Sequence, residues 1–469
     1  MTIKKCTSEL TQFREELYQN FNNRADTLME LVDAICSNPH ASSVVEYSLT
    51  SCFRRSYSTI FKAIAEMTWD EKAILCLLAT YLPQPQARPF RLLGVDVTSQ
   101  PRPFAQTLAD RGIVYQPNTV KGNKPITIGH QYSTVVMLPE GEAGVSSSWV
   151  IPLLTRRVST DEDQALVGAE QVDSLLKDGQ LPFSRDLCVE VGDTSYSKPA
   201  YLYANRHHRH LLTIARVRGT RTFYQQPVPT GSESGAGHPT WYGDAFSLKE
   251  ASTWPEPDET LTLTERSRRG KVHRIEIQAW RDMLMRGKNK PQRLPMHRHP
   301  FTLLRIVRYD EQGQVVYKRP LWLLVIGHRR QELSLLHIYQ AYCQRFDLEH
   351  FFRFGKRKLL LTRFQTPEDV REESWWQLSH LAYAQLWLAR HLAHSLPRPW
   401  ERNLPSMKTC QMSPTLVQRD FGRIIRQIGT PAKPPKRRGI SPGRRTGIKL
   451  PPRPHRKVVV KGLQKANSP

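Results

Sequence analysis

Apolar residues near the start of the chain recur every three or four positions, which is the spacing of one helix face. Leu10, Phe13 and Leu17 show this spacing, and the stretch 53–67 repeats it with basic residues between the apolar ones. Three prolines shortly before residue 90 then interrupt any helix. The pattern predicts a helical N-terminal domain over residues 1–90. Its basic faces fit DNA binding and an ordinary solvated surface equally well.

The pattern changes to short apolar runs after residue 90. Three of these runs, RLLGVDVTS, STVVMLP and SSWVIPLL, are typical of buried strands. A helical stretch at 161–176 follows, and then another strand, DLCVEVGD. Strands followed by a helix and a further strand predict an α/β layer with a central sheet over residues 91–199.

Alternating apolar and polar positions dominate residues 200–333. Ile275, Ile277 and Ala279 face one way, and two apolar runs flank a turn at Asp310–Gly313. We interpret this region as a β-rich insertion. Two stretches inside it have the composition of loops: Gly231–His238 and Trp254–Asp258.

Helical spacing returns over residues 334–430, and the chain then changes composition. Residues 431–469 contain twelve Lys or Arg, eight Pro and no acid. Such a segment buries too little apolar surface to order itself, so we predict a disordered basic tail.

Composition narrows the class of protein. The net charge is +25, which suggests a polyanion such as nucleic acid as partner. Hydrophobic residues make up 39 % of the chain, enough for a sizeable core, and no apolar stretch reaches the ~20 residues that span a bilayer. The seven cysteines include no CxxC pair, so a zinc ribbon or disulfide framework has no support and a reducing, cytoplasmic compartment is expected.

Four polar residues of the stretch AYCQRFDLEHFFRFGKRKL share one side of a predicted helix. At about 100° per residue, Tyr342, Arg345, Glu349 and Lys356 fall within an arc of about 60°. Asp347 faces away. Gly355, directly before Lys356, is a candidate end of this helix.

Two further acids end apolar strands: Asp96 in LLGVDVTS and Asp193 in GDTSYS. An Asp in such a strand costs several kcal/mol unless it is paired or metal-bound. For each Asp taken singly, capping of the following turn is the favoured interpretation. Together with Glu349, however, the two residues form the acid set that holds two Mg²⁺ ions on a phosphodiester.

These residues resemble a DDE transposase of a bacterial insertion sequence, of the group marked by Tyr-(2)-Arg-(3)-Glu-(6)-Lys. Tyr342, Arg345, Glu349 and Lys356 match that spacing without a gap. The Asp within GVDVTS and the Asp within GDTSYS, followed by Tyr196, match the two preceding acids. The resemblance covers roughly residues 90–395.

The resemblance implies an RNase H-like core with the two Asp residues on adjacent central strands, the Glu on a later helix, and a β-rich insertion between them. It implies Mg²⁺-dependent cleavage and strand transfer at transposon ends, with Asp96, Asp193 and Glu349 as catalytic metal ligands for two ions, Mn²⁺ being a substitute. Tyr342, Arg345 and Lys356 would bind DNA phosphates. It further implies double-stranded DNA as partner, a homodimer in the DNA complex, and a bacterial, nucleoid-associated protein.

Other acids and other functions stay open as alternatives. Glu190 precedes Asp193 on the same predicted strand and would point to the opposite face, while Asp310 and Glu332 belong to the insertion and its exit. An inactive or domesticated transposase-derived DNA-binding protein and an RNase H-like Mg²⁺ nuclease are the competing functions.

Aromatic and histidine-rich stretches complete the candidates. Within the family, the insertion often presents an aromatic residue to a flipped base, and Trp254, Trp280 and Trp322 are available, the last in an apolar run typical of a core. RHHRH (206–210) and HRH (297–299) lack zinc-ligand spacing, so basic phosphate-facing loops are the favoured interpretation.

Overall fold

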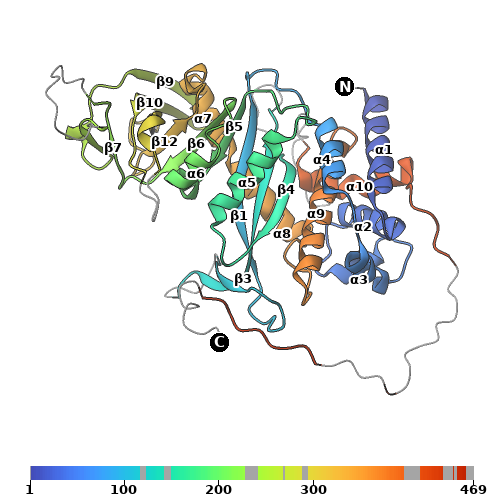
Figure 1. Ribbon diagram of the computed structural model, residues 1–469. Coiled ribbons are helices and arrows are strands. Elements are labelled where there is room, and N and C mark those ends of the chain that lie inside the picture. The colour runs from blue at the N-terminus through green and yellow to red at the C-terminus, as the bar shows by residue number, and fades with distance from the viewer. Residues whose placement is uncertain are drawn as a thin grey trace.

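The computed structural model describes residues 2–116, 123–141, 149–227, 241–267, 270–287, 294–395, 412–436, 447 and 452–460. Figure 1 shows one large sheet flanked by helices, with the N-terminal helices and α9 and α10 gathered at one side. The predicted loop at Gly231–His238 lies outside these residues. None of the helices in the described ranges is long and apolar enough to cross a membrane.

Four helices form most of the N-terminal segment: α1 (Ile3–Asn20), α2 (Ala25–Ser37), α3 (Tyr57–Glu66) and α4 (Glu71–Thr80). The apolar spacing identified in the sequence places Leu10, Phe13 and Leu17 in the core, each fully buried. Asp70 caps the start of α4 by accepting hydrogen bonds from two backbone N–H groups.

Ten strands form the main sheet, in the order β2-β3-β1-β5-β6-β12-β11-β10-β9, with β4 also pairing with β3. The first half of the chain supplies β1 (Arg91–Pro101), β2 (Gly112–Tyr115), β3 (Ile126–Leu138), β4 (Ile151–Val158) and β5 (Cys188–Gly192). The second half supplies β6 (Leu211–Val217), β9 (Glu259–Arg266), β10 (Val272–Met283), β11 (Phe301–Tyr309) and β12 (Leu321–Ile326). A separate pair contains β7 (Thr222–Tyr224) and β8 (Ala245–Ser247).

The centre of the sheet is mixed. β1 runs antiparallel to β3 but parallel to β5, and β5 runs parallel to β6. The helices α5 (Gln164–Lys177) and α6 (Pro199–Ala204) occur between these strands along the chain. This α/β arrangement is compatible with the RNase H-like core that the sequence predicted.

The β-rich region is joined to the core within one sheet, because β12 pairs antiparallel with β6. The sequence placed residues 211–217 in the insertion, but β6 pairs with β5 and belongs to the central strands. Hydrophobic patterning could not make this distinction, since a buried strand has the same pattern in either half of a sheet.

The helical second part contains α7 (Leu335–Gln344), α8 (Phe346–Lys358), α9 (Asp369–Ala389) and α10 (Pro414–Ile428). Gly355 does not end a helix, because α8 continues to Lys358. The break falls earlier, at Arg345, which ends α7 and begins α8 while keeping helical φ and ψ angles.

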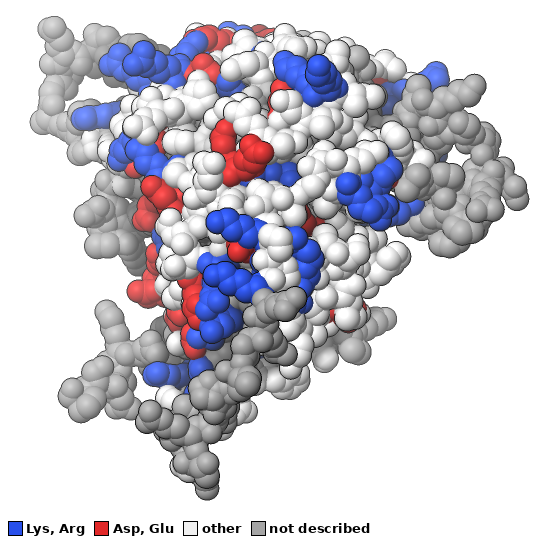
Figure 2. Space-filling view, turned by 90° about the vertical axis from the view of Figure 1, so that its right-hand side faces the viewer, with Lys and Arg blue, Asp and Glu red and all other residues white. Residues whose placement is uncertain are grey.

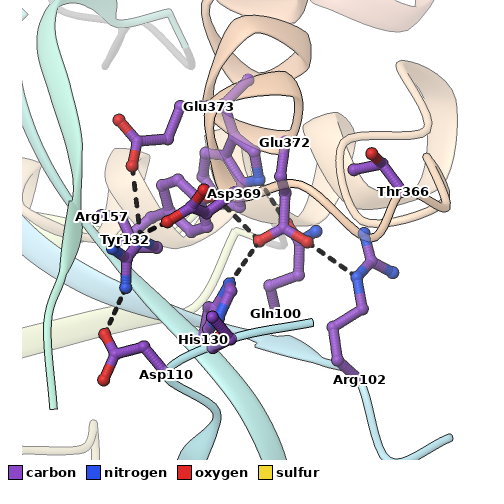
Figure 3. Close-up of polar contacts among 12 residues, drawn as sticks. Gln100, Arg102, Asp110, His130, Tyr132, Arg157, Thr366, Asp369, Glu372 and Glu373 are labelled. Atoms are coloured by element: carbon purple, nitrogen blue, oxygen red, sulfur yellow. Dashed lines mark hydrogen bonds and ion pairs between the residues drawn. The ribbon is translucent and has the colours of Figure 1, made fainter. Parts of the chain in front are cut away.

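Buried polar contacts join the helices to each other and to the sheet. Arg14 of α1 forms an ion pair with Asp33 of α2, and both contact Gln385 of α9. Glu372, at the start of α9, accepts hydrogen bonds from Arg102 and Tyr132 at the sheet and contacts His130 (Figure 3). The N-terminal helices thus pack with the C-terminal ones rather than alone.

The described part of the tail contacts the core, although its composition predicted disorder. The backbone N–H of Arg456 donates to the carbonyl of Gln106 at 2.7 Å, and that of Val459 donates to the carbonyl of Arg111 at 2.8 Å. The prediction of disorder was based on charge and proline content and did not consider the apolar run Val458–Val460, which lies beside β2.

Candidate active site

Two parallel strands bring the predicted Asp residues side by side. β1 pairs with β5 in a register that sets Gly94 opposite Val191. Continued by two residues, this register sets Asp96 opposite Asp193, which directly follows β5. Each acid follows a run of buried residues, 91–95 on β1 and 188–192 on β5, so the backbone that leads to it is held by the core.

Asp193 also caps a turn, as the alternative interpretation expected. Its Oδ1 accepts a hydrogen bond from the backbone N–H of Ser195 at 2.7 Å, at the start of the short 3-10 helix Thr194–Ser197. Tyr196 is buried behind it, and the pKa of its phenol is raised by burial and then by the charges of Asp96 and Asp193. The capping hydrogen bond therefore holds the Asp193 carboxylate in place, and this carboxylate still lies near Asp96.

A glycine allows α8 to approach β1 at the site. A Cβ atom at Gly94 would lie 2.4 Å from Cδ1 of Leu348, so a larger residue would clash with this side chain of α8 and force it to move. Residues 94, 96 and 98 share one face of the strand, since side chains alternate. Gly94 thereby brings Glu349, the neighbour of Leu348 on α8, toward the face that carries Asp96.

Arg345 lies between two of the three acids. Its Nη2 donates to Oε1 of Glu349 at 2.9 Å, and its Nη1 is 3.8 Å from Oδ2 of Asp96. The guanidinium is 8 % exposed and packs against the rings of Phe346 and Tyr342. Its Nε has no hydrogen-bond partner among the described residues.

The acids perturb one another. Burial raises the pKa of Asp96 to about 6; Arg345 opposes this shift, and the negative charges of Asp193 and Glu349 add to it. The site therefore brings three carboxyl groups together with the guanidinium of Arg345. A carboxylate cluster of this kind favours binding of a hard divalent cation.

The remaining two predicted residues lie at the same place. Nζ of Lys356 donates to Oγ1 of Thr98 at 2.6 Å; burial lowers the pKa of this ammonium, and Asp96 opposes the shift. Tyr342 is 2 % exposed, and burial raises the pKa of its phenol while Arg345 and Arg216 oppose that shift.

Two residues that act on Lys356 and Tyr342, namely Thr98 and Arg216, were not predicted from the sequence. Thr98 lies two residues after Asp96, and its hydrogen bond with Lys356 depends on how α8 crosses β1. Arg216 is an exposed Arg within the otherwise buried strand β6, and that contrast was its only signal in the sequence.

The alternative acids lie elsewhere. Glu190 is fully buried and accepts hydrogen bonds from Tyr201 and Thr213, with its pKa raised by burial. Asp310 accepts two backbone hydrogen bonds within its turn, and Glu332 forms an exposed ion pair with Arg329. Asp347 is buried toward α9, where burial and then the charge of Asp347 raise the pKa of Tyr383, so it does face away from the Arg345–Glu349 stripe.

The three tryptophans of the insertion pack together. Trp280 and Trp322 are 2 % and 3 % exposed, and Trp254 lies against both rings. The expectation that Trp322 belongs to a core agrees with this burial.

Besides the three predicted acids, a second group of residues could hold a metal ion, and the two groups differ in how close their donor atoms lie. In the described ranges, only Asp173, His207 and His208 bring one donor atom each within 4.8 Å of the other two. Both ring Nε2 atoms contact Oδ1 of Asp173, while Lys177 is 2.6 Å from its Oδ2. Histidine spacing alone could not show this group, because Asp173 lies 34 residues before His207.

Basic residues do not form a single surface on the helical side. Figure 2 shows Lys and Arg side chains there in separate groups among acidic and uncharged ones. In α2 and α3 and at their ends, Arg24 pairs with Glu66 at 2.7 Å and Arg54 pairs with Glu30 at 2.6 Å. These pairs favour neither of the two interpretations of the basic helix faces.

The sequence matches the family described as DDE superfamily endonuclease over residues 16–287, which is more than half of the chain. The protein belongs to this family. The match includes Asp96 and Asp193 and ends before α7 and α8. Membership defines a nuclease-type enzyme that acts on DNA, in a family that normally uses divalent metal ions. No curated protein gives a significant match to the sequence.

Proposed function

We propose that this endonuclease is a transposase, which cleaves DNA at transposon ends and transfers the cut strand to a target. The observation that carries the proposal is the register of β1 and β5, which sets Asp96 beside Asp193, together with the packing of α8 against β1 at Gly94. The spacing of Tyr342, Arg345, Glu349 and Lys356, shared with one group of transposases, supports strand transfer beyond simple cleavage.

Asp96, Asp193 and Glu349 would hold the divalent cations, with Mg²⁺ favoured by a donor set made only of carboxylates. The proximity of the three acids supports this fit: after burial and Arg345, the negative charges of Asp193 and Glu349 act on the pKa of Asp96. Bound at these carboxylates, the cations would lower the pKa of a coordinated water or 3′-hydroxyl and neutralise charge on the scissile phosphate.

The basic residues of α7 and α8 would bind and orient the DNA backbone. Arg345 has an unused Nε donor, and a guanidinium can contact a phosphate through two N–H groups at once. Lys356, held over β1 by Thr98, would act on a neighbouring phosphate as a point charge. Tyr342 would donate its hydroxyl to a phosphate oxygen. Double-stranded DNA is thus the proposed partner, in a complex with two copies of the protein.

A cleavage assay on a duplex carrying the ends of the element tests the proposal. Asp96→Ala should reduce the Mg²⁺-dependent rate by more than about 100-fold, since loss of even an outer partner of a metal site costs 10–100-fold. Glu332→Gln removes an exposed carboxylate of the same chain and should keep the wild-type rate. Full cleavage by the Asp96 variant would reject the assignment.

The same assay with pre-cleaved ends separates the competing functions. A transposase should join those ends to a target duplex, and Mn²⁺ should replace Mg²⁺. Cleavage without joining would indicate an RNase H-like nuclease instead. DNA binding without either reaction would indicate an inactive, transposase-derived binding protein.

A further inference from the structure

The two histidine-rich stretches of the sequence meet in the structure. Arg206, from the loop after α6, lines a small pocket together with Arg298 and His299, which precede β11. His328 and Arg330, which follow β12, complete its basic lining. No acidic residue lines this pocket, which we call the Arg206 pocket.

Arg206 is the buried charge of the pocket. The residue is 6 % exposed, and burial lowers the pKa of its guanidinium. Its Nη2 donates to the neutral hydroxyl of Thr213 at 2.8 Å, and its Nε has no hydrogen-bond partner in the described structure. Glu190 accepts a hydrogen bond from that same Thr213 hydroxyl, and its charge acts on Arg206 with this neutral group as their shared partner. A buried cation without a direct acid is costly unless an anion approaches it.

Two further arginines extend this charge toward the surface. Arg330 pairs with Asp282 and donates to the carbonyl of Gly327, but its buried Nε is unpartnered among the described residues. Arg298 is exposed at the mouth and has no ion pair within the described ranges. Asp282 and the buried Glu190 therefore stand against three guanidinium groups, which leaves a net positive cavity.

The size of the pocket limits its ligand. The cavity measures ≈ 50 Å³, and one water needs about 10–15 Å³ in this measure, so three to five water-sized atoms fit. That matches the oxygens of one tetrahedral oxyanion. Gly327 allows the tight wall: its φ is +142°, and a Cβ there would lie 2.6 Å from the carbonyl oxygen of Leu211.

The pocket is separate from the carboxylates. β6 runs parallel to β5, with Leu211 beside Cys188 at the start of both strands, whereas Asp193 follows their far ends. The five residues of β5 span about 16 Å at ~3.3 Å each. A group bound at Arg206 is therefore not the one being cut.

We propose that the Arg206 pocket binds a phosphate group, either as a free anion or as part of DNA. Arginine suits this ligand because its planar N–H groups match phosphate oxygens in pairs. Binding of the free anion is independent of the proposed function; binding of a DNA phosphate rests on it.

Binding of inorganic phosphate to the full chain, measured by calorimetry in EDTA at constant ionic strength, tests the pocket. Arg298→Gln should weaken binding about tenfold, the value of one charge-assisted hydrogen bond. Arg329→Gln removes the same charge one position from Arg330, outside the lining, and should leave binding unchanged. Circular dichroism establishes that both variants are folded. Equal phosphate binding by the two variants, or none by the wild type, would overturn the proposal.

Competition with DNA then identifies the source of the phosphate. A duplex with 5′-phosphate ends that displaces inorganic phosphate better than its 5′-hydroxyl twin would assign a strand terminus. Equal displacement by both would assign the phosphodiester backbone, and displacement by neither would assign the free anion. Cleavage without phosphate binding would reject the pocket alone, whereas phosphate binding without cleavage would reject the transposase proposal alone.

Discussion

At the scale of one residue, the ionised carboxylate of Asp96 lowers the stability of the folded protein. Its carboxyl group has a pKa of about 6, above the ordinary 3.8, because it is buried beside Asp193 and Glu349. A carboxyl group whose pKa is raised in the folded state favours folding when it is protonated. This advantage is complete at acid pH and is lost as the pH rises through about 6.

Asp96→Asn should therefore stabilise the protein at pH 8, by up to roughly 3 kcal/mol for a shift of about two pKa units. The gain should shrink toward pH 4, where the wild-type residue is protonated in the fold. Urea unfolding at the two pH values measures the difference, with the exposed Glu332→Gln variant as control. A variant less stable than the wild type at pH 8 would contradict the electrostatic account.

The residues of the site were predictable to different degrees. Asp96 and Asp193 were found because an acid inside a run of buried residues is conspicuous, and Glu349 because four polar residues share one spacing. Thr98 and Arg216 were missed, since their roles depend on side chains that reach them from α7 and α8. An alternating pattern reports which face a residue occupies but not what crosses that face.

At the scale of elements, the contact between β1 and α8 controls the distance between the acids. Gly94 is the residue that permits it, because Leu348 already fills the space that a Cβ would need. The sequence predicted both elements correctly but not their crossing. It also placed Tyr342 and Glu349 on one continuous helix, because neither Gly nor Pro marks the break at Arg345.

Gly94→Ala should destabilise the protein by about 1–3 kcal/mol through overpacking. Leu348→Ala should cost about 2–5 kcal/mol by leaving a cavity. The double variant should cost less than the sum, because the smaller residue 348 makes room for the new methyl group. Denaturant unfolding of the four proteins measures this coupling.

Gly422→Ala is the matched control. Gly422 lies within α10, and a Cβ there meets no atom within 4 Å, so alanine should stabilise the helix by about 0.5–1 kcal/mol. Strict additivity between positions 94 and 348 would show that α8 does not rest on β1 through these two residues.

At the scale of the whole molecule, buried charges hold the N-terminal helices to the C-terminal ones. Arg14 and Asp33 are 2 % and 1 % exposed, and Nη2 of Arg14 also reaches the carbonyl of Gly429 at 3.1 Å. Sequence analysis treated the first 90 residues as separate, because periodicity within a helix does not show which distant helix covers its apolar face.

Asp33→Asn should cost about 3–5 kcal/mol, because it leaves the Arg14 guanidinium buried without its counter-charge. Replacing both residues by apolar ones of similar size, Arg14→Met with Asp33→Leu, should recover much of that loss. Glu66→Gln, which breaks the exposed pair with Arg24, should change stability little. Urea unfolding compares all three, and an Asp33→Asn variant as stable as Glu66→Gln would refute the role of the buried pair.

The pairing of β6 with β12 has a mechanical consequence. An unbroken ladder of backbone hydrogen bonds runs from the strand that carries Asp96 to the outer strand β9, so the insertion has no hinge at this junction. For any DNA held by the insertion, the protein would therefore fix the distance between the DNA-holding surface and the carboxylates. The DNA would then have to bend to fit this distance. Because the cost of bending depends on the DNA sequence, it would influence which site is cut without any contact to a base.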